Sequence, residues 1–263
     1  MHTADHEQLG IVLSGGGARG AAHIGALLAL EEHNIFPHFV AGTSAGSIVG
    51  AMYAHGVRNM EMLRFWEKNN PFTFSNFSFG KPGLIDTDKV EESLIPLLPF
   101  LFKQLRRPFY VPATDIVTGK LKIFEEGPLI RAVLASSSFP MVFTPTMVQG
   151  HLYLDGGILS NFPVELIRDK VKVLIGINIS PLRDMNGVQL DSMFDIAQRA
   201  FELSTNNTSQ QKLSACDIYL CPPELSQFAT FDTDPVERLF EIGYEAMNTQ
   251  IPALKVLLEE VAS

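Results

Sequence analysis

The chain of 263 residues is poor in cysteine and in positive charge. Its two cysteines, Cys216 and Cys221, lie on one predicted strand, where a rise of about 3.3 Å per residue keeps them too far apart to pair. No histidine is close to them in sequence, so they do not indicate a metal site. Lysine and arginine number 20 against 29 aspartate and glutamate, a net charge of −9. This balance argues against nucleic acid as a partner, because phosphate binding needs clustered positive charge.

Long hydrophobic runs and a targeting segment are missing as well. The longest uncharged apolar run, residues 94–102, is too short to cross a bilayer, and the polar N-terminus has no signal-peptide pattern. We therefore expect a cytoplasmic protein whose contact with a membrane is peripheral. Hydrophobic residues make up 46% of the chain, and no repeat or composition shift marks a boundary, so we expect a single domain over residues 1–263.

The most informative stretch is residues 41–46, Ala-Gly-Thr-Ser-Ala-Gly. A short apolar stretch before it, residues 35–40, is predicted to be a strand, and apolar residues at helical spacing follow it. Ser44 between Gly42 and Gly46 therefore has the G-x-S-x-G form of a nucleophile elbow. Such a turn is too sharp for bulky neighbours, and the helix N-terminus favours negative charge developing near the hydroxyl. The alternative is that Ser44 only caps the helix.

A glycine-rich loop follows the first predicted strand, residues 9–13, and opens a helix. Gly15, Gly17 and Gly20 satisfy G-x-G-x-x-G, the fingerprint of a dinucleotide site. That site needs an acidic residue near the end of the second strand, and residues 34–59 contain none. The other use of such a loop is as an oxyanion hole, where backbone N–H groups converge without obstruction by side chains. Packing of helix on sheet explains Gly20 but not three successive glycines.

Predicted strands and helices alternate along the rest of the chain. Strands are expected at residues 108–117, 120–124, 151–154, 171–177 and 217–221, and helices at 59–68, 128–135 and 192–213 and from about residues 86, 161 and 235. This alternation predicts a largely parallel sheet with helices on both faces. The turn at residues 155–157, Asp-Gly-Gly, follows one of the strands, and a hairpin turn is its local interpretation.

Phenylalanine is concentrated between residues 72 and 109, where seven of them are interleaved with turn residues. Lys103, Arg106 and Arg107 lie in the same region. This composition suits a lid or an acyl-chain entrance that contacts an anionic lipid surface. An irregular part of the core is the alternative.

Three motifs stand in order along the chain, at residues 15–20, 42–46 and 155–157. Together they resemble the patatin-like phospholipase family, whose pattern is a glycine-rich oxyanion loop, a G-x-S-x-G nucleophile and a D-G-[GA] base. The resemblance runs from about Leu9 to Ile179. It also takes in Ser136 with Pro140, and Asn161 with Pro163.

The resemblance implies a three-layer α/β/α sandwich with a central, mostly parallel sheet, related to the catalytic domain of cytosolic phospholipase A2. It implies hydrolysis of acyl esters of phospholipids, lysophospholipids or related lipids, without a cofactor or metal. A serine acyltransferase or thioesterase would use the same residues with another acceptor, and the oligomeric state is left open. The implied site consists of Ser44 as nucleophile, Asp155 as general base within a motif completed by Gly156 and Gly157, and oxyanion donors on the backbone of Gly15, Gly16 and Gly17, extending toward Arg19.

The positions of the histidines predict a Ser–Asp dyad without a histidine. An ordinary α/β-hydrolase has the order Ser, Asp, His, yet no histidine follows Asp155 here. His151 is the nearest rival, but about 13 Å would separate it from Asp155 along a straight strand. We therefore expect His151 to pack or to hydrogen-bond at the start of the strand. Asp155 then takes the Ser44 proton directly, and partial burial strengthens it as a base.

Overall fold

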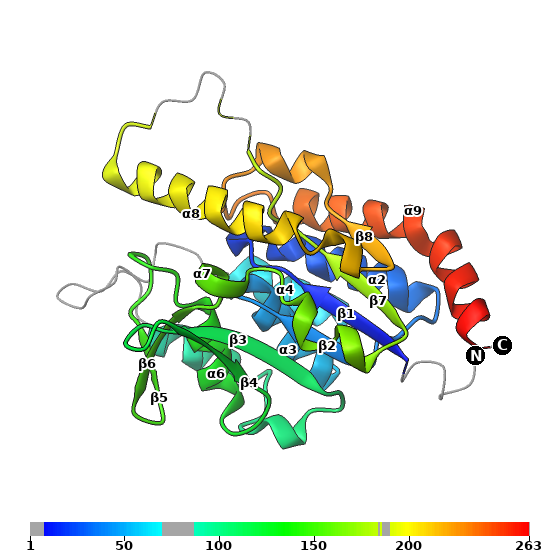
Figure 1. The fold of residues 1–263 in the computed structure, drawn as a ribbon, viewed down its shortest axis with the longest axis horizontal. Coiled ribbons are helices and arrows are strands. Elements are labelled where there is room, and N and C mark those ends of the chain that lie inside the picture. The colour runs from blue at the N-terminus through cyan, green and yellow to red at the C-terminus, as the bar shows by residue number, and fades with distance from the viewer. Residues whose placement is uncertain (1–7, 70–86, 184, 186–189, 263) are drawn as a thin grey trace.

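The computed structural model describes residues 8–69, 87–183, 185 and 190–262, and in it helices flank one central sheet (Figure 1). The strands are β1 (Leu9–Leu13), β2 (Phe39–Gly42), β3 (Phe109–Asp115), β4 (Lys120–Phe124), β5 (Thr146–Val148), β6 (His151–Asp155), β7 (Val173–Ile177) and β8 (Ile218–Leu220). The helices are α2 (Ala21–Glu32), α3 (Ala45–His55), α4 (Asn59–Asn69), α5 (Thr87–Leu94), α6 (Leu129–Ser137), α7 (Gly157–Ser160), α8 (Met193–Gln210) and α9 (Val236–Ala262).

The sheet has the order β5-β6-β3-β2-β1-β7-β8, and β4 also pairs with β3. The pairs β3–β2, β2–β1, β1–β7 and β7–β8 are parallel. The pairs β3–β4, β3–β6 and β5–β6 are antiparallel. The residues of β1, Leu-Gly-Ile-Val-Leu, are all buried, as expected for an apolar strand between two parallel neighbours. The predicted, mostly parallel sheet is confirmed, with an antiparallel edge added at β4, β5 and β6.

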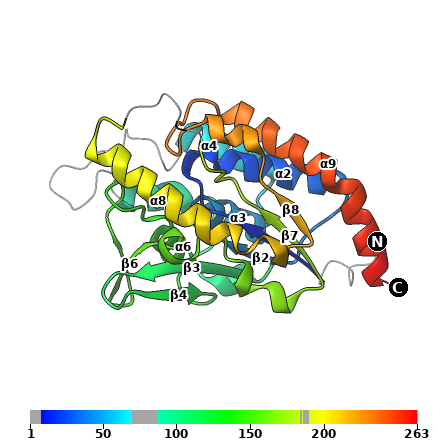
Figure 2. The same ribbon diagram turned by 45° about the horizontal axis from the view of Figure 1, so that its top comes forward.

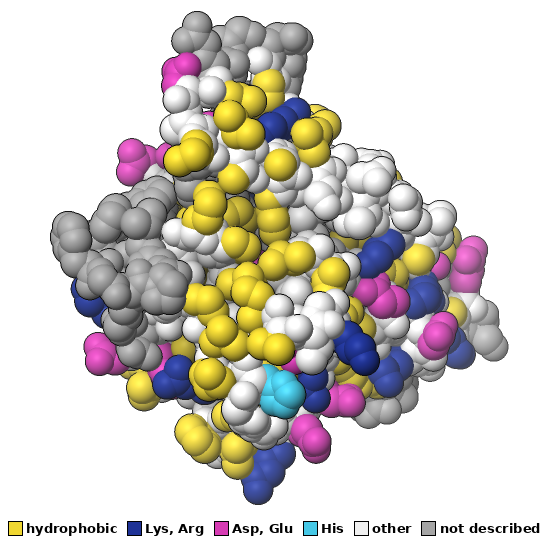
Figure 3. Space-filling view, turned by 60° about the vertical axis from the view of Figure 1, so that its left-hand side comes forward, with side chains coloured by type: hydrophobic (Ala, Val, Ile, Leu, Met, Phe, Trp, Pro, Cys, Tyr) yellow, Lys and Arg dark blue, Asp and Glu magenta, His cyan; other side chains and the backbone are white. Residues whose placement is uncertain are grey.

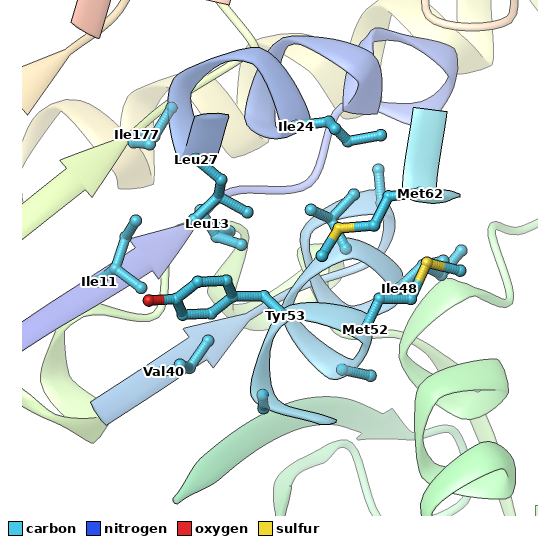
Figure 4. Close-up of a cluster of buried hydrophobic side chains, with 14 of the residues drawn as sticks. Ile11, Leu13, Ile24, Leu27, Val40, Ile48, Met52, Tyr53, Met62 and Ile177 are labelled. Atoms are coloured by element: carbon cyan, nitrogen blue, oxygen red, sulfur yellow. The ribbon is translucent and has the colours of Figure 1, made fainter. Parts of the chain in front are cut away.

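The two faces of the sheet are covered unequally. Leu9, Ile11 and Leu13 on one side of β1 belong to a large apolar core that includes side chains of α2, α3, α4, α6 and α9, part of which is shown in Figure 4. Figures 1 and 2 both show α9 lying along α2. Val12 points to the other face and packs in a smaller cluster with Phe162 and Leu174. The three-layer architecture is confirmed, with one thick and one thin helical layer.

The thin layer corrects one sequence expectation, because no continuous helix begins at Asn161. The chain instead forms two 3₁₀ turns, Val164–Leu166 and Arg168–Lys170. The backbone leaves helical values between them, with φ −132° at Ile167. This path buries Phe162 completely and leaves Asn161 beside the glycine loop.

The phenylalanine-rich region is also corrected in part. Phe102 and Phe109 are buried, and their stacked rings have centroids 6.1 Å apart, so these two belong to the core and not to an entrance. The phenylalanines at residues 72–79 lie outside the described residues. No helix in the described part of the chain is long and apolar enough to cross a membrane.

Candidate active site

Ser44 lies at the turn between β2 and α3, where its backbone is strained. Its φ of 52° and ψ of −122° fall in a region that residues with a side chain rarely adopt. The chain passes so close to itself that a Cβ on Gly42 would collide with the carbonyl of Gly46, and one on Gly46 with that of Leu13. The Ser44 side chain makes no capping hydrogen bond to α3. The turn therefore has the geometry of a nucleophile elbow and not that of a helix cap.

Three buried serines hold this strained turn. The N–H of Ser44 donates to Oγ of Ser136 at 3.1 Å. The carbonyl of Ser44 accepts from Oγ of Ser47 at 2.7 Å and from Oγ of Ser137 at 3.2 Å. A strained backbone of this kind is destabilising by about 1–3 kcal/mol and persists only where its surroundings fix it. These hydrogen bonds, two of them from the end of α6, supply that constraint.

Asp155 is the last residue of β6 and is only 1% exposed. Its N–H donates to the carbonyl of Ser138 at 2.9 Å, and the N–H of Gly156 donates to the carbonyl of Ser136 at 3.2 Å. The end of α6 therefore fixes both Asp155 and the serine elbow. The chain continues from Asp155 directly into α7, so the hairpin-turn interpretation of this motif is wrong.

Burial raises the pKa of Asp155 to about 7. The N–H of Gly157, which donates to Oδ1 at 2.7 Å, and the nearby Ser44 hydroxyl oppose this rise by favouring the carboxylate. Oδ2 is buried and has no hydrogen-bond partner of normal geometry among the described residues. One carboxylate oxygen is thus held in place while the other is free to accept a proton. With its raised pKa the group is a stronger base than a free aspartate, whose pKa is about 3.9.

The glycine loop after β1 lies against Ser44. A Cβ on Gly15 would be 3.2 Å from the Cβ of Ser44. The N–H of Gly15 donates to the carbonyl of Asn161 at 3.0 Å, so it is not free to bind an oxyanion and its predicted role is corrected. Gly16 and Gly17 line the same pocket as Ser44. They are the glycines of the loop that face the space beside the nucleophile.

The rest of the loop is fixed by contacts with distant parts of the chain. The buried Arg19 guanidinium donates to the carbonyl of Ile179 at 3.1 Å and to Oγ1 of Thr230 at 3.0 Å. Burial lowers the pKa of Arg19 to about 10, so the group stays charged at neutral pH. A Cβ on Gly20 would collide with the indole of Trp66, which agrees with the packing interpretation of this glycine.

Two of the histidines, His151 and His23, lie in different environments. Nδ1 of His151 lies 3.1 Å from Oδ2 of Asp115, so His151 contacts Asp115 and not Asp155. Its side chain is 59% exposed and hydrogen-bonds at the start of the strand, as expected. His23, which the sequence left without a role, is fully buried, and its Nε2 lies 2.9 Å from the carbonyl of Ser14. Burial lowers the pKa of His23 to about 4. A neutral His23 therefore supports the backbone of the glycine loop.

Ser44 and Asp155 line one pocket, with an empty volume of about 540 Å³ including its open mouth. One wall of the pocket is formed by side chains of α8, by residues 180–182, which precede this helix in the chain, and by residues 230–231, which follow it. Phe139 packs edge-on against Phe201 and Phe231, with ring centroids 4.6 and 5.2 Å apart. The other residues that line the pocket are Gly16, Gly17, Arg19, Asn161, Ser180, Pro181, Leu182, Gln198, Glu202, Thr205 and Thr230.

The α8 side of the pocket was missed by the sequence analysis. Phe201, Glu202 and Thr205 lie on a helix more than 150 residues beyond Ser44, with no motif around them. Only the folded chain brings them to the nucleophile. Within the described residues, no three His, Cys, Asp or Glu side chains are grouped so that they could hold a metal ion.

Comparison with solved structures places this fold among known ones. The chain aligns with VipD from Legionella pneumophila at a TM-score of 0.50 and 16% identity, over 97% of this chain and 67% of that one. It aligns with human GIVD cytosolic phospholipase A2, solved with methyl γ-linolenyl fluorophosphonate, at a TM-score of 0.54 and 13% identity, over 99% of this chain and 60% of that one. At these identities the likeness concerns the fold.

Sequence relatives point to one family. Lysophospholipase NTE1 of Meyerozyma guilliermondii is 26% identical over 91% of this chain and 19% of its own length. Human patatin-like phospholipase domain-containing protein 6 is 27% identical over 90% of this chain and 20% of its own length. An uncharacterised NTE-family protein of Mycobacterium bovis is 33% identical over 60% of this chain and 44% of its own length.

The chain thus spans less than half the length of these curated relatives. The family model described as patatin-like phospholipase matches residues 11–167, which contain the glycine loop, the serine elbow and Asp155. The chain therefore belongs to the patatin-like phospholipase family.

Proposed function

We propose that this protein is a serine acyl hydrolase that cleaves acyl esters of phospholipids, lysophospholipids or related lipids through a Ser44–Asp155 dyad. The observation that carries the proposal is the pairing, in one pocket, of a strained serine with a buried aspartate whose pKa is raised to about 7. The names of relatives, among them a lysophospholipase, support a lipid ester as the substrate class. The aromatic side of the pocket suits an acyl chain.

In the first half of the reaction, Oγ of Ser44 attacks the ester carbonyl and Asp155 takes the hydroxyl proton on Oδ2. The carbonyl oxygen becomes an oxyanion beside the backbone N–H groups of Gly16 and Gly17, to which we assign its stabilisation. Collapse of this intermediate transfers the acyl group to Ser44. Protonated Asp155 returns its proton to the departing alcohol.

In the second half, a water molecule attacks the acyl-Ser44 ester. Asp155 takes the proton of the water, and the same backbone donors stabilise the second oxyanion. Release of the fatty acid restores the Ser44 hydroxyl when Asp155 returns the proton. Each proton that Asp155 accepts is therefore given back within the cycle, and no other group of the chain has to change its charge.

The contacts of the two nearest candidate histidines support direct proton transfer from Ser44 to Asp155. His151 contacts Asp115, and the buried His23 contacts the carbonyl of Ser14, so neither imidazole lies between Ser44 and Asp155. Burial of Asp155 raises the pKa of its carboxyl group to about 7, so the carboxylate can act as the base without a histidine.

The proposal is tested by incubating the pure protein with a total lipid extract and following lipid species by mass spectrometry. We expect phospholipid or lysophospholipid species to decrease while free fatty acids accumulate, and Ser44→Ala to produce neither change. A fluorophosphonate probe should label Ser44 in the wild type. Labelling of another residue, or equal lipid consumption by Ser44→Ala, would contradict the proposal.

A further inference from the structure

Helix α8 carries a charged pair on its less exposed side and apolar side chains on the outer side of its first three turns. Among the described side chains of these turns, the exposed ones recur at helical spacing and are Met193, Ile196, Ala200 and Leu203. Met193 is 89% exposed, Ile196 55% and Leu203 48%. Arg199 and Glu202 pair at 3.4 Å, with side chains only 17% and 14% exposed. A surface helix that faces water has the opposite arrangement, so the outer side of α8 is suited to an apolar neighbour.

Exposed apolar side chains also lie at the pocket and on the neighbouring helix α7. Phe201, Glu202 and Thr205 on the inner side of α8 line the pocket that holds Ser44. Leu182, which precedes α8 in the chain, both lines the pocket and is 41% exposed. Leu159 on α7, a helix that packs against α8, is also 41% exposed. Exposed apolar side chains therefore occur at the pocket, on α8 and on α7.

The space-filling view of this end of the molecule shows the same arrangement. Hydrophobic side chains gather in a band across the face on which α8, α7, β5 and β6 lie, and most charged side chains stand at its margins (Figure 3). Exposed apolar surface that continues into a pocket is uncommon on a monomer that meets only water. We propose that this α8 face inserts into the surface of a lipid aggregate and presents the pocket to it; the inference rests on the proposed function for its lipid partner.

The distribution of charge indicates which lipid surface is suited to this face. The described side chains that are exposed in the first three turns of α8 include no lysine or arginine. Arg106 and Arg107 of the basic patch lie against Gly56 and over the ring of Tyr53, at the C-terminal end of α3, whereas Ser44 is at its N-terminus. The exposed side of α8 therefore supplies no attraction to anionic headgroups. It matches the apolar interfacial zone of a neutral phosphatidylcholine bilayer, and its binding depends little on salt.

Binding is measured by flotation with phosphatidylcholine vesicles, in a Ser44→Ala background so that no lipid is consumed. The triple change Met193→Gln/Ile196→Gln/Leu203→Gln keeps good helix formers at exposed positions, so the fold is retained. We expect it to lower the vesicle partition coefficient about tenfold or more, because three apolar side chains no longer enter the interface. The bound fraction of the Ser44→Ala parent should change little between low and high salt.

A matched pair of single changes separates the effect of the α8 face on vesicle binding from the effect of a more polar surface elsewhere on the protein. Ile196→Gln and Val256→Gln each replace a β-branched side chain on a helix, 55% and 54% exposed, but Val256 lies on α9. Ile196→Gln should reduce vesicle binding, and Val256→Gln should leave it unchanged. Equal binding by the triple variant and its parent, or no binding by the parent, would overturn the inference. So would light scattering showing a dimer that the triple change dissociates, because a second copy would then be the occupant.

The experiment separates this inference from the proposed function. Vesicle binding by Ser44→Ala protein needs no turnover, so intact binding without any lipid hydrolysis by the wild type contradicts only the proposed function. Hydrolysis of a short soluble ester together with absent vesicle binding contradicts only the role of the α8 face. In the wild type, the triple change should lower the rate on vesicles at least several-fold and leave the rate on the soluble ester within about twofold.

Discussion

The floor of the pocket, formed by Ser44, Asp155 and the end of α6, and its outer wall, formed by α8, use polar groups in different ways. In the floor, backbone and hydroxyl groups of Ser136, Ser137 and Ser138 bind the two candidate catalytic residues, so their relative position is fixed. In the wall, charged groups pair with one another, and the aromatic and aliphatic groups provide surface. The floor is therefore suited to chemistry and the wall to holding substrate, and substitutions in the two regions should change different kinetic constants.

The largest effect is expected from Asp155→Asn in the floor. Because asparagine cannot accept a proton at neutral pH, turnover should fall about a thousandfold or more. His151→Ala removes contacts with Asp115 and with the ring of Tyr153, neither of which is a candidate catalytic residue, so its kcat should stay within about twofold of the wild type. Steady-state kinetics on a soluble ester measures both. The reverse ranking of the two variants would replace the dyad with a histidine-dependent mechanism.

A smaller effect in the floor is expected from Ser136→Ala. Loss of its hydroxyl leaves the buried N–H of Ser44 without a partner, a defect of about 1–3 kcal/mol. We expect kcat to fall about tenfold or more while KM changes little, because the position of Ser44 is disturbed and the wall is intact. Ser138→Ala is the control, since its buried hydroxyl binds Leu134 and Thr146 and makes no bond to Ser44. Equal kcat values for the two variants would show that α6 acts through stability alone.

In the wall, Phe201→Ala should act mainly on KM. It removes an edge-on contact with Phe139 that is worth about 0.5–1.5 kcal/mol, together with part of the surface available to an acyl chain. We expect KM for a long-chain ester to rise about three- to tenfold, with little change in kcat and little effect on an acetyl ester. An equal loss of kcat on both esters would show that Phe201 affects the chemical step, and would contradict the proposed division of roles between floor and wall.

A local sequence rule predicted the serine elbow of the floor, whereas Asp155 was assigned only through the family resemblance, and the wall was not predicted. Gly42, Ser44 and Gly46 are within five positions of one another, so a local turn rule predicts the elbow. The glycine loop was predicted by the same kind of rule, but the rule does not show that the N–H of Gly15 is already bonded to Asn161, because that contact joins distant segments. The α8 wall depends wholly on such contacts. The sequence of this helix contains no motif, and only the folded structure shows that its residues lie beside Ser44.

The same reason explains the corrected elements. The sequence suggested a helix from Asn161, yet the packing of Phe162 against the sheet favours short turns there. Phe102 and Phe109 lie in a region whose composition suggested an exposed entrance, but each has a place in the core. In both cases tertiary packing overrides a local pattern. Strands β1 and β7 were predicted well because a strand between parallel neighbours is buried and apolar along its whole length. The second strand was predicted at residues 35–40, but β2 is Phe39–Gly42 and runs directly into the serine elbow.

The smallest effect concerns stability and its dependence on pH. Burial raises the folded-state pKa of Asp155 to about 7, above the unfolded value near 3.8, so the folded state binds the proton more tightly. Ionisation of Asp155 therefore destabilises the fold progressively as the pH rises from about 4 to 7, and fully above that range. Asp155→Asn should raise Tm by a few degrees at pH 8 and by less as the pH falls toward 4. Calorimetry at the two pH values measures the difference, and an equal or lower Tm of the variant at pH 8 would show that the carboxylate is stabilised in the fold.

The most direct test of the central claim, that Asp155 itself removes the Ser44 proton, is the pH dependence of Ser44 acylation. The pre-steady-state burst of p-nitrophenol from p-nitrophenyl butyrate reports this step in the wild type and in His151→Ala. We predict that both rates rise through one ionisation near pH 7 and then level off, because the base must be ionised and its pKa is that of Asp155. A rate that does not change across this range, or an ionisation that disappears in His151→Ala, would contradict the dyad.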